Sequence, residues 1–169
     1  LPDARKIIGL NVSGSGTQAV LANLDGDFKC NIVEIELPDS AEDIASNIIQ
    51  AVRSLQDKTD FSWSTVVGVG VSLRGSFDSP NGLYFYPGSI RPIPLQEQLD
   101  SQIPVPILLD HNSRLAILAE SVDGLAKGCQ NAMFINIDRG VSAGLIVDGR
   151  ILLLTTLFDL KLVALFGQE

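Results

Sequence analysis

Lys6–Val12, with the sequence KIIGLNV, decides the fold because it is an apolar run rich in β-branched residues, as strands are. Gln18–Leu24 (QAVLANL) has the same character and follows a Ser/Gly stretch. After a turn signal at Asp25-Gly26-Asp27, Cys30–Leu37 (CNIVEIEL) alternates apolar and polar residues with the period of a half-buried strand. The three segments predict two consecutive hairpins, which form an antiparallel three-stranded edge of a sheet.

A helix is predicted to start at Ser40, whose hydroxyl can cap the amides of a first turn, with Asp43 three residues later as in a capping box. The apolar residues that follow are spaced by four, four and three positions and form one stripe, which consists of Ile44, Ile48, Val52 and Leu55. Ser64–Leu73 (STVVGVGVSL) is a second β-rich run. Strand, helix and strand in this order predict a right-handed crossover.

The rest of the chain predicts the same kinds of element. A short helix is expected over Pro94–Leu99, a buried strand over Val105–Leu109, and further strands over Ala132–Ile137 and Leu145–Val147 with a Gly-rich turn around Gly140. A longer helix is expected over Ser113–Ala126, with an inward face formed by Leu115, Leu118, Val122 and Leu125. The predicted fold class is α/β, with a mixed sheet flanked by helices, in one domain over residues 1–169.

Composition excludes several classes of protein. Of the 169 residues 46% are hydrophobic, which is enough for a sizeable core, and the net charge of −8 repels the phosphates of nucleic acids. Two cysteines, Cys30 and Cys129, form no disulfide framework, and no secretory signal opens the chain, so a cytoplasmic location is expected. The apolar tract Ile151–Phe166 is shorter than the about 20 residues that span a bilayer. We expect it to be a buried strand followed by a core-facing helix, with no membrane contact.

Three polar loops follow predicted strands, where α/β proteins usually bind ligands. In Asn11–Thr17 (NVSGSGT), small residues let backbone N–H groups approach a phosphate, and a tight hairpin turn without a ligand explains the same residues. In Asp138–Gly144 (DRGVSAG), a phosphate-facing turn and ordinary hairpin geometry are again both open. Asp138 would repel a phosphate there and Arg139 would attract one.

The remaining loop is Asp110-His111-Asn112, which opens the helix after the Val105–Leu109 strand. A carboxylate at this place suits a general base, whereas Asn112 is also explained as a helix N-cap. His111 is the only histidine, so no metal site is expected. The chain has no GxxxxGK[ST] sequence, which excludes a Walker ATPase.

Four motifs in this order resemble the ROK family of sugar kinases and sugar-responsive repressors, whose members have a two-lobed, actin-like fold of the ribonuclease-H type. The resemblance runs from about Lys6 to Arg150 and rests on Ile8–Ser15 with Leu24–Gly26, Gly68–Gly75, Val105–Asn112 with Ala116–Glu120, and Ile137–Arg150. It implies two phosphate loops, at Asn11, Ser13, Gly14 and Ser15 and at Asp138, Gly140, Ser142 and Gly144. It also implies sugar contacts at Gly75, His111 and Asn112.

The departures from the family pattern concern the kinase chemistry. The catalytic Asp of the family is Asn112 here, and an amide has negligible basicity, so it cannot take the proton of a sugar hydroxyl. The metal-holding Asp of the first loop is Asn11, and Asp138 replaces a Gly in the second, as in the repressor branch. Arg74 stands where the sugar-side turn has proline. No catalytic residue and no cofactor are therefore expected.

The preferred hypothesis is a non-catalytic N-terminal lobe of a transcriptional regulator of the N-acetylglucosamine- or xylose-repressor type. It would be a homodimer that senses a sugar or sugar phosphate, and it would touch DNA only through a helix-turn-helix outside residues 1–169. The second lobe, with the zinc-binding Cys cluster of the family, is likewise not expected in these residues. One alternative is a fragment of an ATP- and Mg²⁺-dependent sugar kinase of the hexokinase or glucokinase kind, with Asp110 or Asp138 as substitute base. Another is a degenerate dimerisation module.

Overall fold

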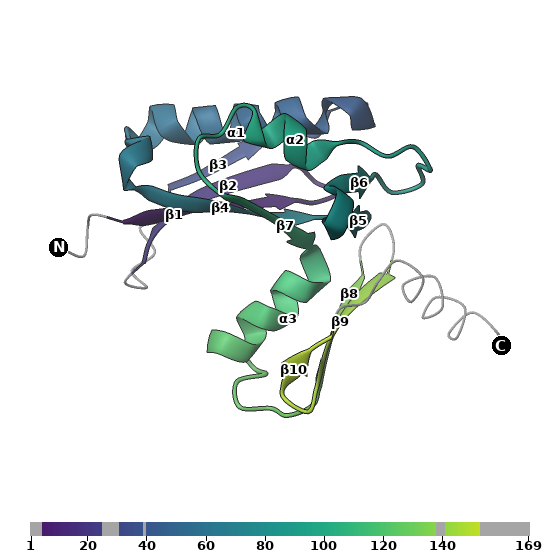
Figure 1. The fold of residues 1–169 in the computed structure, drawn as a ribbon. Helices are drawn as coiled ribbons and strands as arrows, with labels where there is room; N and C mark the ends of the chain where they lie inside the picture. Colours follow the sequence, from purple (N-terminus) through teal and green to yellow (C-terminus); the bar gives the residue numbers. More distant parts are fainter. Residues whose placement is uncertain (1–4, 25–30, 39, 138–140, 153–169) are drawn as a thin grey trace. The chain divides into compact units, whose positions relative to one another are not determined.

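A computed structural model of the chain describes residues 5–24, 31–38, 40–137 and 141–152 (Figure 1). The chain divides at Asp110 into two compact units, residues 1–110 (unit 1) and residues 111–169 (unit 2). Each unit has its own sheet and its own cluster of buried apolar side chains. The expectation that residues 1–169 behave as one domain stays a prediction.

Unit 1 contains a mixed five-stranded sheet in the order β3-β2-β1-β4-β7. The strands are β1 (Lys6–Val12), β2 (Thr17–Asn23), β3 (Asn31–Ile35), β4 (Val66–Leu73) and β7 (Ile107–His111). β2 pairs antiparallel with both β1 and β3, while β4 pairs parallel with β1. The predicted antiparallel edge and the mixed sheet are therefore confirmed.

The crossover helix is α1 (Ile44–Thr59), and it begins four residues later than predicted. A short 3₁₀ turn over Ala41–Asp43 precedes it, and the Ser40 hydroxyl accepts a hydrogen bond from the amide of Glu42 at 3.2 Å. Asp43 makes no side-chain capping bond. Ser40 thus caps the 3₁₀ turn and not α1, because the first backbone amides of the segment without a helical partner belong to that turn.

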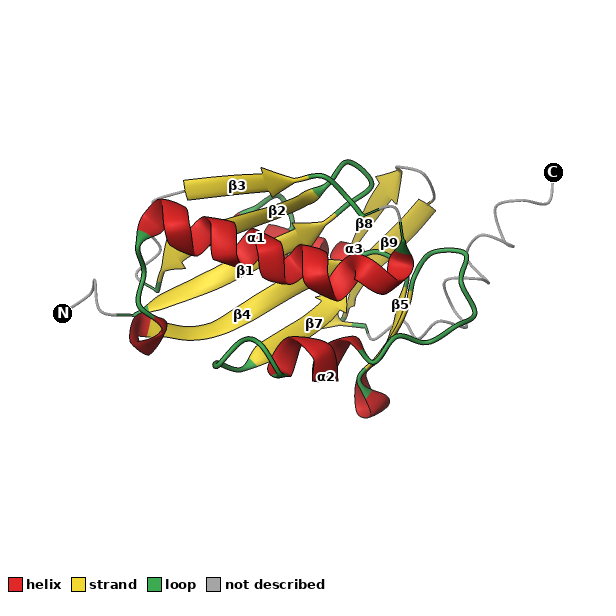
Figure 2. Ribbon diagram, turned by 90° about the horizontal axis from the view of Figure 1, so that it is seen from above, coloured by secondary structure: helices red, strands yellow, loops and turns green. Residues whose placement is uncertain are grey.

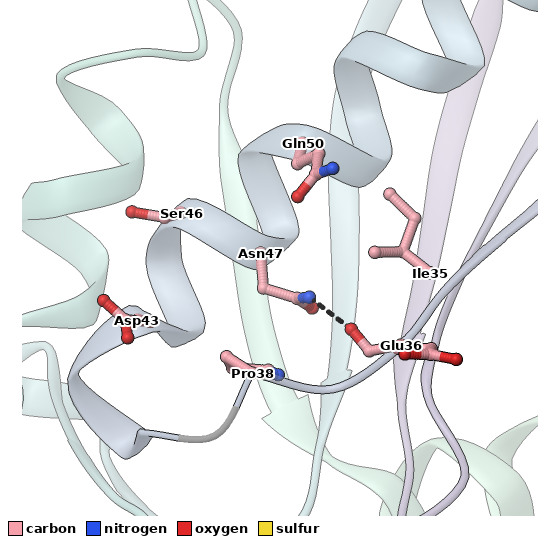
Figure 3. A pocket seen from close by; sticks show the side chains of 7 residues that line it. All are labelled: Ile35, Glu36, Pro38, Asp43, Ser46, Asn47 and Gln50. Atoms are coloured by element: carbon pink, nitrogen blue, oxygen red, sulfur yellow. Dashed lines mark hydrogen bonds between the residues drawn. The ribbon is translucent and has the colours of Figure 1, made fainter.

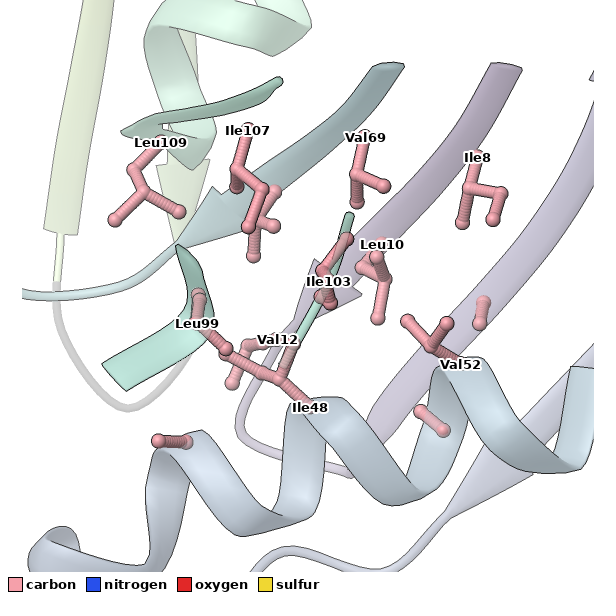
Figure 4. Packing of buried hydrophobic residues seen from close by; sticks show 14 of the residues in the cluster. Ile8, Leu10, Val12, Ile48, Val52, Val69, Leu99, Ile103, Ile107 and Leu109 are labelled. Carbon is pink, nitrogen blue, oxygen red and sulfur yellow. The ribbon is translucent and has the colours of Figure 1, made fainter. Parts of the chain in front are cut away.

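The predicted stripe of α1 is confirmed as the centre of the core. Ile44, Ile48, Val52 and Leu55 are all at most 2% exposed. They pack against inward side chains of the sheet such as Ile8 (Figure 4). Both α1 and α2 (Leu95–Asp100) lie over the same face of the sheet (Figures 1 and 2). A small hairpin of β5 (Ser76–Asp78) and β6 (Leu83–Phe85), and 3₁₀ turns at Trp63–Thr65 and Ser79–Asn81, complete unit 1.

Unit 2 consists of one helix and a three-stranded antiparallel sheet in the order β10-β9-β8. Its elements are α3 (Asn112–Asp123), β8 (Ala132–Ile137), β9 (Val141–Val147) and β10 (Arg150–Ile151). Ile117 of α3 forms the buried cluster together with Ala126 and Ile146.

The predicted inward face of α3 is wrong. Leu118 and Val122 are 42% and 62% exposed, and Leu125 lies beyond the end of the helix and is 97% exposed. Ser113 and Ile117 are the buried residues instead. Two stripes of this helix have helical spacing, and periodicity alone does not tell which one faces the sheet.

Three expectations lie outside the described residues: the turn at Asp25-Gly26-Asp27, the turn around Gly140 and the core-facing helix expected at the end of the tract Ile151–Phe166. Among the described residues, no helix is both long and apolar enough to cross a lipid bilayer.

Replacing Ile48 by alanine tests the core. The side chain is fully buried on α1, so we expect Ile48→Ala to lower the free energy of unfolding by about 2–5 kcal/mol in urea titrations. The matched control is Ile90→Ala, because Ile90 is 93% exposed, and its effect should stay within about 0.5 kcal/mol. Similar losses from the two variants would contradict this packing.

Candidate functional site

The carboxyl ends of β1 and β4 meet at one edge of the unit 1 sheet, because the two strands are parallel. Asn11, near the end of β1, is exposed and lies in register with Ser72 on β4. The sugar-side turn at Arg74-Gly75 follows directly after β4. The structure thus brings the first predicted phosphate loop and the predicted sugar loop to the same edge of the sheet.

The first predicted phosphate loop is a tight hairpin turn between β1 and β2. The amide of Ser13 donates to the carbonyl of Gly16 at 2.9 Å. The hydroxyls of Ser13 and Ser15 are 2.8 Å apart and bond to each other. The Ser13 hydroxyl also donates to the Gly16 carbonyl at 3.2 Å. These bonds are those expected if Ser13, Gly14 and Ser15 form a tight hairpin turn. Phosphate binding by this loop stays a prediction.

Gly75 is required by the backbone of the turn between β4 and β5. Its φ is +88°, in the left-handed region that favours glycine. A Cβ atom there would lie 2.4 Å from the carbonyl oxygen of Phe85 on β6. The glycine therefore lets this loop close against the hairpin, and whether it also contacts a sugar stays a prediction.

The loop after β7 forms the N-cap of α3. His111 is the capping residue in place of the expected Asn112, which is the first residue of the helix. The amide of Ser113 donates to Asn112 Oδ1 at 2.8 Å and is 3.4 Å from His111 Nδ1. The Ser113 hydroxyl, which is fully buried, is 2.7 Å from the same His111 nitrogen. The side chains of His111 and Asn112 are thus both oriented by Ser113.

The described part of the second predicted phosphate loop lies in a strand. Asp138 and Gly140 lie outside the described residues, whereas Ser142 and Gly144 belong to β9, which begins at Val141 and not at Leu145. Ser142 pairs with Asn136 of β8, and Gly144 pairs with Phe134. The small residues Ser142 and Gly144, which were predicted to lie in a turn, therefore form part of the antiparallel pairing between β8 and β9. Their part in phosphate binding stays a prediction.

Gly144 has a structural role that the sequence did not indicate. A Cβ atom at this position would lie 2.1 Å from the carbonyl oxygen of Ser113 and 2.7 Å from the Cγ2 atom of Ile117. The helix therefore packs directly on the backbone of β9 at this point. Gly144 holds the first turn of α3, and with it the His111 cap, against the sheet of unit 2.

Tyr84 on β6 is a buried polar residue that sequence analysis missed. Burial raises the pKa of its hydroxyl well above the ordinary value, Tyr86 adds to the rise, and Arg74 opposes it. The rings of Tyr84 and Tyr86 meet edge to face at 6.4 Å. The phenol stays neutral at any ordinary pH, so it is suited to hydrogen bonding and not to proton transfer. The only sequence signal was an aromatic cluster, Tyr84-Phe85-Tyr86.

Two depressions in unit 1 flank α1, and no predicted site residue lines either of them. The first, of about 340 Å³, lies where the chain passes from β3 to α1 (Figure 3). Asn47 in its wall is buried, donates to the Glu36 carbonyl at 2.7 Å and accepts from the Thr17 hydroxyl. Because both polar atoms of this amide have partners, Asn47 ties α1 to β2 and to the β3–α1 connection.

Among the described residues, no group of three or more His, Cys, Asp or Glu gathers as a metal site would need.

Comparison with known proteins places this geometry in a family. The sequence profile of the ROK family matches residues 7–153. A glucokinase of Halalkalibacterium halodurans is 25% identical over 154 residues, which cover 88% of this chain and 46% of the relative. The xylose repressor of Bacillus subtilis is 22% identical over 148 residues, which cover 85% of this chain and 38% of the relative. The chain thus spans less than half the length of these two relatives.

A solved structure shows the same fold. The crystal structure of a ROK family transcriptional regulator, a homologue of the Escherichia coli Mlc protein, superposes with a TM-score of 0.76 at 18% identity. The superposition covers 89% of this chain and 39% of the chain of that regulator. The structural neighbours also include ROK sugar kinases of the actin-like fold, so the predicted fold class is confirmed.

Adding a methyl group at Gly144 tests the contact between α3 and β9. We expect Gly144→Ala to destabilise unit 2 by about 1–3 kcal/mol, because helix and strand must move apart. Amide hydrogen exchange in β8 and β9 would show the loss of protection. Gly70→Ala is the matched control, since a Cβ on that strand glycine meets nothing within 4 Å. Unchanged exchange in Gly144→Ala would refute the contact.

Proposed function

This chain belongs to the ROK family, and we propose that it is the sugar-sensing part of a non-catalytic transcriptional regulator of that family. Its relatives include both repressors and glucokinases, so family membership alone does not choose between sensing and phosphate transfer. The residues at the carboxyl ends of the strands and at the start of α3 support sensing.

The observation that carries the proposal is the amide at position 112. Asn112 stands where the resemblance places the catalytic base, and its Oδ1 accepts the amide hydrogen of Ser113 at 2.8 Å. With its oxygen engaged, the side chain offers its NH₂ group as a hydrogen-bond donor. A donor can hold a sugar hydroxyl but cannot remove its proton, and loss of a general base costs about 10²–10⁴ in rate. This side chain is therefore suited to bind and not to catalyse.

The proposed effector is a sugar or a sugar phosphate. His111, Asn112 and Gly75 would hold it by hydrogen bonds, as the family resemblance implies. His111 and Asn112 are both oriented by Ser113, so their polar atoms are fixed before a ligand arrives. Such a site recognises the pattern of hydroxyls on a sugar without acting on it.

The proposed regulator works in the cytoplasm as a homodimer and contacts DNA through a helix-turn-helix outside residues 1–169. The net charge of −8 supports this arrangement, because these residues themselves repel a phosphate backbone. Effector binding would favour one arrangement of the DNA-binding heads over another.

A sugar kinase fragment is the second candidate, favoured by the identity with the Halalkalibacterium glucokinase. The residues present fit ATP and Mg²⁺ poorly. Mg²⁺ prefers carboxylate oxygens, whereas residue 11 at the end of β1 is an asparagine, and the hydroxyls of Ser13 and Ser15 bond to each other. These residues therefore do not support phosphate transfer by this chain. The third candidate is a module that only dimerises.

Calorimetric titration with sugars tests the sensing role. We expect at least one member of a panel of glucose, xylose, N-acetylglucosamine and their phosphates to bind. Asn112→Ala should weaken that binding about tenfold through the loss of one hydrogen bond to the sugar. Asn131→Ala, an exposed asparagine of the same unit, should not change it. If no sugar of the panel binds, the dimerisation module replaces this proposal.

Restoring the carboxylate tests the absence of catalysis. In the full-length polypeptide we expect neither the unmodified protein nor Asn112→Asp to phosphorylate a sugar with ATP above background, because Asn11 still lacks a charge for the metal. A coupled assay for ADP release measures this. Activity of the unmodified protein would refute the non-catalytic role. Activity gained by Asn112→Asp would show that the nucleotide loops are intact.

A further inference from the structure

His111 is the only histidine of the chain, and its Nδ1 atom has two partners on Ser113. A neutral imidazole carries one hydrogen, on Nδ1 or on Nε2, and the nitrogen without the hydrogen accepts hydrogen bonds. The contacts of one ring nitrogen therefore determine whether the other one carries the hydrogen. Ser113 contacts Nδ1 both with its backbone amide and with its hydroxyl, so each contact is evidence on the state of the ring.

The backbone amide of Ser113 identifies Nδ1 as an acceptor. The amide nitrogen is 3.4 Å from Nδ1 and donates its hydrogen toward that atom. An amide N–H can only donate, so a hydrogen on Nδ1 would point at another hydrogen. The same amide bonds more closely to Asn112 Oδ1, at 2.8 Å, so its contact with His111 is the weaker part of a shared bond.

The hydroxyl of Ser113 gives the stronger argument. Its Oγ atom is 2.7 Å from His111 Nδ1, and Ser113 is fully buried. Within the part of the chain that the structure describes, this hydroxyl has no other acceptor within hydrogen-bond distance. Burying an O–H group without an acceptor is costly, so the hydroxyl donates to Nδ1. The hydrogen of the neutral ring is then on Nε2.

We propose that Ser113 is a positioning residue that holds His111 in the tautomer with its hydrogen on Nε2. In that tautomer the neutral ring meets an effector only as a hydrogen-bond donor. This inference rests on the proposed function, because it concerns how the proposed sugar site recognises its ligand.

Asn112 has the same polarity toward a ligand. Its Oδ1 atom accepts the amide hydrogen of Ser113, so its NH₂ group is the part that donates. Ser113 thus engages an acceptor atom of both side chains. An effector atom held by both His111 and Asn112 therefore has to be an acceptor. A hydroxyl or phosphate oxygen meets this requirement, whereas the ammonium group of an amino sugar does not.

NMR spectroscopy measures the tautomer directly, because isotope labelling of histidine labels His111 alone. Nitrogen spectra of the full chain are recorded at about pH 8, above the ordinary pKa of histidine. We expect the Nδ1 signal far downfield of the Nε2 signal, as for a ring nitrogen without a hydrogen. A directly bonded hydrogen should be found on Nε2 only.

Ser113→Ala removes the hydroxyl and tests its role. We expect the two nitrogen signals to move toward each other as the tautomers mix. The sugar that binds the unmodified protein should bind about threefold more weakly. Ser121→Ala is the matched control, since the Ser121 hydroxyl donates to the Leu118 carbonyl of the same helix at 2.7 Å and should affect neither result. Amide hydrogen exchange in β8 and β9 verifies that both variants stay folded.

Three results would overturn the proposal. A hydrogen on Nδ1 of the unmodified protein would exclude the assigned tautomer, even if a sugar binds. Unchanged nitrogen signals in Ser113→Ala would show that another contact sets the tautomer. Mixed tautomers with unchanged sugar affinity would exclude a role of Ser113 in recognition. The spectra need no ligand, so the assigned tautomer is tested even if no sugar binds and the proposed function fails.

Discussion

The packing of α1 on the sheet of unit 1 is the constraint on which the rest of that unit depends. Ile48 and Leu55 are fully buried against the strands, so the helix must lie across the sheet. A strand that follows such a helix back into the sheet runs parallel to the strand it joins, as β4 does beside β1. The end of β1 and the turn at Gly75 then face the same edge. One apolar stripe thereby positions residues that lie more than sixty positions apart.

At the start of α3, the proposed function depends on the amide at position 112. A carboxylate there could accept a proton, whereas an amide has negligible basicity, and the Oδ1 atom of Asn112 already accepts a hydrogen bond from the amide of Ser113. The same Ser113 contacts His111, and its backbone carbonyl faces Gly144 without room for a methyl group. Contacts within unit 2 therefore hold the side chains of His111 and Asn112, the two proposed sugar contacts of that unit.

The two units show where sequence patterns determine a fold and where they do not. The stripe of α1 was predicted correctly because only one face of that helix is apolar. Helix α3 has two stripes of residues with helical spacing. The stripe with Ser113 and Ile117 is buried, because Gly144 has no side chain and lets this side of the helix pack on the backbone of β9. Likewise, the residue types of Ser142 and Gly144 predict a turn, but both residues belong to a strand because they pair with Asn136 and Phe134 of β8.

Local chemistry is what the sequence by itself determined: the strands and their alternation, the helix stripe of α1, the amide in place of a carboxylate at Asn112, and the acidic charge. These properties belong to neighbouring residues or to single side chains and need no knowledge of distant contacts. Tertiary structure alone decided that His111 caps α3, that Gly75 closes against Phe85, and that Gly144 admits the helix. Each of these depends on a contact between segments separated along the chain or on the path of the backbone, which no spacing of residue types records.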